Sequence, residues 1–120
     1  KYHPEVNDDY VVPDIMLVCN RKGLKHSAYH GTPKFIVETL SPATALRDKT
    51  EKKEIYEQAG VSEYWIVSPR EHAVEIYYLE EGKYKLVYSY ILQEDADTII
   101  TLREFPHIAM TLGEIFDKVD

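Results

Sequence analysis

The stretch Phe35-Ile36-Val37-Glu38-Thr39-Leu40 decides the fold, because it is a strand-length apolar run broken by a single acid. A helical segment follows and runs to Ala59, and Gly60 stands where a helix C-cap is expected. The next apolar run, Tyr64–Val67, again has the length of a strand. Two strands joined through one helix are expected to lie parallel in one sheet, with a right-handed crossover.

Working outward from this unit, the pattern predicts more strands and a short terminal helix. Further strands are expected at Ile15–Cys19, Ala73–Leu79, Tyr84–Ile91 and Thr98–Leu102, the middle two forming a hairpin whose loop contains Gly82. Thr111 and Glu114 have the spacing of a capping box at the start of the terminal helix. The order of elements predicts an α/β domain, more specifically an α+β mixed sheet with one central and one C-terminal helix packed against it.

Length and composition exclude several classes of protein. The 120 residues suit one domain, 1–120, in which residues 1–10 form a flexible lead. With 14 Lys and Arg against 21 Asp and Glu, the net charge of −7 argues against strong non-specific binding to nucleic acid. The single cysteine, Cys19, allows neither an internal disulfide nor a cysteine-built zinc site. No apolar run is long enough to span a bilayer, so we expect a cytoplasmic protein without a membrane partner.

Two acids stand where charge is costly. Asp14 follows Pro13 at the mouth of the apolar strand 15–19, and Glu38 is surrounded in sequence by apolar residues. By strand alternation Glu38 shares one face with Ile36 and Leu40, so its own strand offers it no polar neighbour. An unpaired buried carboxylate would cost several kcal/mol or take up a proton. A partner is therefore required.

Two partners satisfy this requirement. The first is a cation from the helix, where Asp48, Lys52 and Tyr56 recur every four residues and fall on one face. The second is a divalent metal held by Asp14 and Glu38, for which Mg²⁺ is suited because it favours one or two carboxylates plus water and phosphate. A strand glutamate that faces a helix lysine is, however, often only a structural ion pair. The spacing alone leaves both readings open.

Several segments, in order, resemble the Uma-two family of the PD-(D/E)xK nuclease superfamily. They are Val12–Val18, Pro33–Thr44 and Ala59–Val67, with Asp48, Lys52 and Tyr56 between the last two. The resemblance runs from about Val11 to the C-terminus and includes Phe105-Pro106 and the terminal Thr-Leu-x-Glu-Ile-Phe helix. It implies a restriction-endonuclease-like core. Family members carry a further N-terminal helix and hairpin, so we expect this chain to be part of a longer family domain. Without that region, strands at the edge of the sheet would be exposed, and exposed edges favour a homodimer.

The resemblance also implies roles for individual residues. Asp14 and Glu38 match the two acids of the superfamily motif and would be metal ligands, with the backbone carbonyl of Thr39 as a third. The superfamily lysine is expected two residues after the second acid, where this chain has Leu40. In branches where the lysine has moved to the following helix, its counterpart here is Lys52.

Other residues would support this group. Lys53 is the rival to Lys52, although it faces about 100° away on an ideal helix. Ser41, at the strand-to-helix turn, would support Glu38 or donate to a phosphate, and Asp48 and Tyr56 would flank Lys52.

The function implied is a metal-dependent endonuclease that uses Mg²⁺ or Mn²⁺ to activate water against a DNA phosphodiester. Asp14, Glu38 and Lys52 would be its catalytic residues. Because of the charge of −7, binding to DNA is expected to be weak, local and metal-dependent. The alternative is a catalytically inert nuclease-fold binding or assembly module, in which Glu38 and Lys52 form only a structural ion pair.

Overall fold

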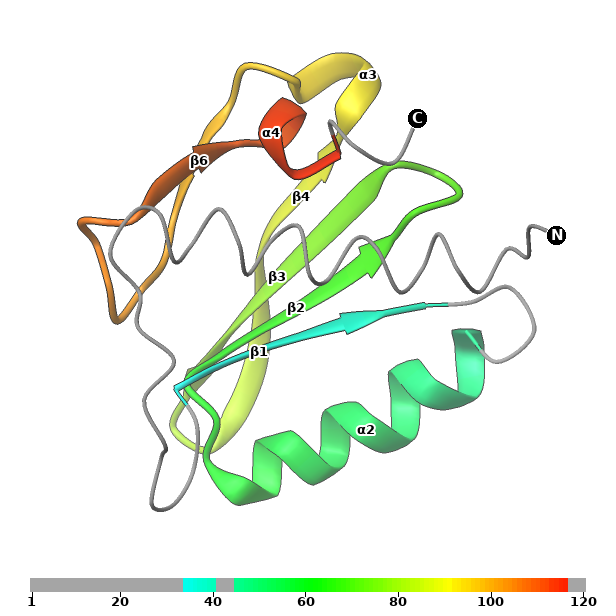
Figure 1. Cartoon of the computed structure of the whole chain (residues 1–120). Coiled ribbons are helices and arrows are strands. Elements are labelled where there is room, and N and C mark those ends of the chain that lie inside the picture. Colours follow the sequence, from blue (N-terminus) through cyan, green and yellow to red (C-terminus); the bar gives the residue numbers. More distant parts are fainter. Residues whose placement is uncertain (1–33, 41–44, 117–120) are drawn as a thin grey trace, which may run out of the picture.

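The computed structural model describes residues 34–40 and 45–116 as a mixed α+β fold (Figure 1). Its elements, in chain order, are β1 (Phe35–Thr39), α2 (Ala45–Ala59), β2 (Glu63–Ser68), β3 (Ala73–Glu80), β4 (Lys83–Ile91), α3 (Leu92–Asp95), β5 (Ile99–Thr101), β6 (Ala109–Thr111) and α4 (Leu112–Phe116). The strand expected at Ile15–Cys19 and the lead at residues 1–10 lie outside the described residues. Within the described part, no helix is long and apolar enough to cross a bilayer.

The main sheet has the strand order β1-β2-β3-β4. β1 and β2 run parallel, with Glu38 opposite Ile66, whereas β2-β3 and β3-β4 are antiparallel. The parallel pairing across α2 and the mixed sheet confirm the predictions made from residues 35–67. The short strands β5 and β6 form a separate antiparallel pair.

Local sequence signals end or begin several elements where they were expected to. Gly60, with φ of 87°, closes α2 in a Schellman motif: its N–H donates to Glu57 O (3.2 Å), and the Val61 N–H donates to Tyr56 O (3.1 Å). At the hairpin between β3 and β4, Glu81 and Gly82 have φ of 52° and 79°, as a two-residue type I′ turn requires.

The capping box at α4 is confirmed. The Thr111 N–H donates to Glu114 Oε1 (2.8 Å), and the Glu114 N–H donates to Thr111 Oγ1 (3.1 Å). Two elements were not predicted, the one-turn helix α3 and the three-residue strand β6. Both are shorter than the window over which hydrophobic periodicity can be read.

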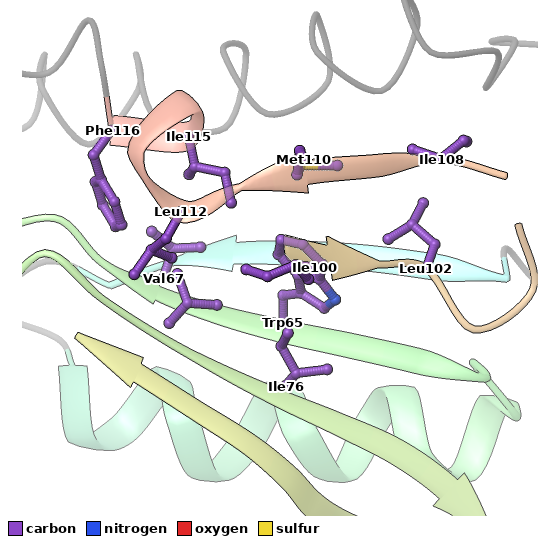
Figure 2. Close-up of a cluster of buried hydrophobic side chains, with 11 residues drawn as sticks. Trp65, Val67, Ile76, Ile100, Leu102, Ile108, Met110, Leu112, Ile115 and Phe116 are labelled. Atoms are coloured by element: carbon purple, nitrogen blue, oxygen red, sulfur yellow. The ribbon is translucent and has the colours of Figure 1, made fainter. Parts of the chain in front are cut away.

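Both faces of the sheet contribute to a hydrophobic cluster, although most residues of β4 are exposed. One face carries Trp65, Val67 and Ile76, which pack under β5, β6 and α4 (Figure 2). The other face carries Tyr64, Ile66, Tyr77 and Tyr84, with Ile36, Leu40 and Tyr56 packed against them. Figure 1 shows α2 along this second side. The alternation predicted for β1 is confirmed, since Phe35 and Val37 join the first cluster and Ile36 and Leu40 the second.

A buried acid links β2 to the segment after β5. Glu63 is only 1% exposed, and its Oε2 accepts a hydrogen bond from Trp65 Nε1 (2.8 Å). Its Oε1 accepts from the backbone N–H of Arg103 (2.7 Å). Burial raises the pKa of Glu63, while the two hydrogen bonds oppose the shift. The sequence pattern around Glu63 did not predict that it is buried.

The two hydrogen bonds to Glu63 yield a stability prediction. Glu63→Ala leaves the buried Trp65 Nε1–H and the partly buried backbone N–H of Arg103 without acceptors, and it is expected to lower the free energy of unfolding by about 2–4 kcal/mol. Glu63→Gln is expected to lose less, because its amide keeps one oxygen. Urea unfolding measures both changes. Glu104→Gln is the control, since the Glu104 carboxylate accepts from Ser62 Oγ at the surface. A Glu63→Ala variant as stable as wild type would contradict this account.

Candidate active site around Glu38

Glu38 lies on the face of β1 that α2 covers. Its neighbours on that face, Ile36 and Leu40, pack into the tyrosine-rich cluster beneath the helix. The Glu38 side chain keeps 18% of its surface exposed, so it is largely desolvated but still reachable. The apolar sequence around it therefore places a carboxylate at the border between the core and solvent.

Two groups from α2 contact this carboxylate. Tyr56 Oη donates a hydrogen bond to Glu38 Oε2 at 2.7 Å. Lys52 Nζ lies 3.3 Å from Oε1, and the Lys52 side chain is 43% exposed. The four-residue spacing from Lys52 to Tyr56 brings both groups to Glu38, as the helix-face pattern predicted. Because Lys52 is so exposed, its ion pair contributes at most about 1 kcal/mol, and the short bond from Tyr56 holds the carboxylate more firmly.

Lys53 takes a different position. Its Nζ lies 4.5 Å from the centre of the Tyr77 ring, in a cation–π contact on the same side of the sheet. Of the two lysines left open by the sequence, Lys52 is therefore the one that reaches Glu38.

The phenol of Tyr56 is held in its neutral form. Burial raises its pKa to about 12, and the hydrogen bond to Glu38 and the charge of that carboxylate act in the same direction. At neutral pH the hydroxyl is therefore a fixed donor. It orients the carboxylate without adding charge.

Three more tyrosines line the sheet beneath Glu38. The Tyr64 ring lies 5.4 Å from Tyr56, 5.5 Å from Tyr84 and 6.1 Å from Tyr77. Tyr84 Oη donates to Val61 O (2.8 Å), and Tyr77 Oη donates to Glu75 Oε1 (3.2 Å). Tyr64 is fully buried, yet its hydroxyl has no hydrogen-bond partner in the described structure. Tyr64 was not predicted as a site residue, because a tyrosine inside an apolar strand gives no sign in the sequence that its hydroxyl is unpaired.

The other predicted site residues are less completely placed. Thr39 ends β1 opposite Val67, and its Oγ1 is buried without a partner among the described residues. The ligand role of its backbone carbonyl stays a prediction. Asp48 belongs to α2, but its side chain lies outside the description. Asp14 and Ser41 also lie outside the described residues.

The donor set at Glu38 is compatible with Mg²⁺. Among the side chains described, those of residues 34–40 and 50–116, no three His, Cys, Asp or Glu gather as metal ligands. Mg²⁺, however, needs only one or two carboxylates, because water and phosphate complete its octahedron. Glu38 supplies one accessible carboxylate whose Oε1 is held only by the 3.3 Å contact with Lys52.

Comparisons with known proteins identify the family and the fold. A model of the Uma2 family, described as "putative restriction endonuclease", matches residues 1–113. The fold is similar to the crystal structure of a "putative nuclease" belonging to DUF820 from Anabaena variabilis ATCC 29413, with a TM-score of 0.58 and 15% sequence identity. The similarity covers 84% of this chain but only 56% of that one, so the chain spans little more than half the length of its structural relative. No curated protein matches the sequence.

The short bond at Glu38 gives the second prediction. Tyr56→Phe removes the hydroxyl but keeps the ring against Tyr64, and it is expected to lower the free energy of unfolding by about 1–2 kcal/mol. Tyr88→Phe is the matched control, because that ring is 47% exposed on β4. Chemical denaturation compares the two variants. Equal, negligible losses in both would show that the bond to Glu38 contributes nothing.

Proposed function

Because the chain belongs to the Uma2 family of "putative restriction endonucleases", we propose that it is a metal-dependent endonuclease that hydrolyses DNA phosphodiester bonds. The observation that carries the proposal is the arrangement at Glu38, where Tyr56 orients the carboxylate and an exposed lysine contacts its other oxygen. The fold class and the family support a nuclease. The metal, the DNA substrate and the role of each residue are proposed.

Each residue has a defined task in this proposal. Glu38, Asp14 and the carbonyl of Thr39 would hold Mg²⁺ or Mn²⁺, which when bound would lower the pKa of a water molecule and neutralise charge on the phosphate. Lys52 contacts the scissile phosphate and orients the attacking water. Tyr56 keeps Glu38 in position through its neutral hydroxyl, and Ser41 and Asp48 support the group from the turn and the helix.

The electrostatics limit how DNA is bound. A chain with a net charge of −7 gains little from counterion release over its whole surface. The proposal therefore places binding at the site itself, through Lys52 and the metal, and expects it to be weak without the metal. A cytoplasmic location and a homodimer stay predictions.

A second candidate function has its own supporting observation. Both oxygens of Glu38 already have partners within the chain, Lys52 and Tyr56. A binding or assembly module without activity would need nothing more from this group. It predicts no metal binding and no cleavage.

Removal of Glu38 separates the two candidates. Glu38→Ala is expected to reduce Mg²⁺- or Mn²⁺-dependent cleavage of plasmid DNA by about 10²-fold or more, since it removes a ligand and the partner of Lys52. Circular dichroism establishes that the variant is folded. Glu81→Ala, an exposed acid at the β3–β4 turn, controls for the lost charge. Undiminished cleavage by Glu38→Ala would refute the nuclease assignment of this site.

The adjacent lysines offer a matched pair in the same assay. Lys52→Met is expected to lower the cleavage rate strongly, whereas Lys53→Met should retain it because Lys53 contacts Tyr77 instead of Glu38. Both variants lose one positive charge from the same helix. Equal losses would show that only the overall charge of α2 matters.

A further inference from the structure

The unpaired hydroxyl of Tyr64 lies in the same layer as Glu38. Tyr64 is on β2, directly opposite Ile36, while Glu38 is opposite Ile66. Tyr64 and Glu38 are therefore diagonal neighbours on the face covered by α2, with Cα atoms about 8 Å apart from the usual rise and strand spacing. The side chains of a tyrosine and a glutamate together can bridge that separation.

This hydroxyl is costly as it stands. A buried hydroxyl without a partner loses its hydration and gains nothing in return, so phenylalanine would be the more stable choice in this cluster. The other three tyrosines of the layer each donate to a named oxygen. Of these four tyrosines, only Tyr64 has a hydroxyl without an acceptor in the described structure.

The surroundings of Tyr64 point to Glu38 as the acceptor. Its ring contacts the Tyr56 ring, whose hydroxyl already binds Glu38 Oε2. Burial raises the pKa of the Tyr64 phenol, and the charge of Glu38 is the next largest cause. The remaining carboxylate oxygen, Oε1, is held only by Lys52 at 3.3 Å.

We propose that Tyr64 is a positioning residue whose hydroxyl donates to the Glu38 carboxylate when Lys52 leaves it. This inference rests on the proposed function, because the event that draws Lys52 away is its contact with the DNA phosphate. The carboxylate then keeps two donors, Tyr56 and Tyr64, throughout the reaction. It therefore stays oriented while its cationic partner acts elsewhere.

The test requires no activity. Lys52→Met removes the lysine from Glu38 permanently, and thermal unfolding is measured for wild type, Tyr64→Phe, Lys52→Met and the double variant. In the wild-type background Tyr64→Phe should melt at or above the wild-type temperature, because it removes an unpaired buried hydroxyl. In the Lys52→Met background the same change should lower the melting temperature by several degrees, since Glu38 then loses a donor that it uses.

Tyr84→Phe is the control in both backgrounds. Its hydroxyl donates to Val61 O, away from Glu38, so its loss should lower the melting temperature equally with and without Lys52. If Tyr64→Phe also has the same effect in both backgrounds, the proposal is overturned, whatever the cleavage assay shows.

Cleavage supplies the second readout. Tyr64→Phe is expected to lower kcat by about tenfold with KM for DNA unchanged, because the lost bond forms only after the phosphate has taken Lys52. Wild-type kcat in this variant would overturn the proposal. If the wild-type protein does not cleave DNA at all, the proposed function fails, and the unfolding experiment still decides whether Tyr64 supports Glu38.

Discussion

The structure depends on how a carboxylate in the middle of an apolar strand is accommodated. Glu38 cannot turn to the opposite face without placing its charge among Phe35, Val37 and Trp65. On its own face it is covered by α2, and that helix must supply polar partners at the correct height. Tyr56 and Lys52 supply them, one turn apart. The parallel β1-β2 pair, the helix and the site are thus parts of one solution to the cost of burying a charge.

The layer of tyrosines beneath α2 supplies hydroxyl donors close to Glu38. An aliphatic layer would offer no hydroxyl donor and would leave Glu38 with Lys52 alone, and that exposed ion pair is weak. Phenols provide neutral donors that burial keeps protonated, as the raised pKa of Tyr56 shows. The unpaired hydroxyl of Tyr64 fits the same logic, because reactive sites often retain groups that reduce the stability of the resting protein.

Much of this fold can be predicted from sequence because its signals are local. Gly60, the Glu81-Gly82 turn and the Thr111–Glu114 box each act through backbone geometry within a few residues. The spacing of Lys52 and Tyr56 also predicts that they share a helix face. Glu63 and Tyr64 were missed because their importance arises from partners, or the lack of one, at other places in the fold: one of the two donors to Glu63 is the backbone of Arg103, forty residues away. Sequence patterns carry no information on such distant hydrogen bonds.

The central claim is that Glu38 is a metal ligand and not only the partner of Lys52. Calorimetric titration of Mn²⁺ into wild type and Glu38→Gln tests it most directly, with Glu81→Gln as a control for the same charge change at the β3–β4 turn. The account predicts that Glu38→Gln weakens Mn²⁺ binding by about tenfold or more, while Glu81→Gln binds as wild type does. Equal Mn²⁺ affinity in wild type and Glu38→Gln, or no binding by either, would contradict it and leave Glu38 as a structural ion pair.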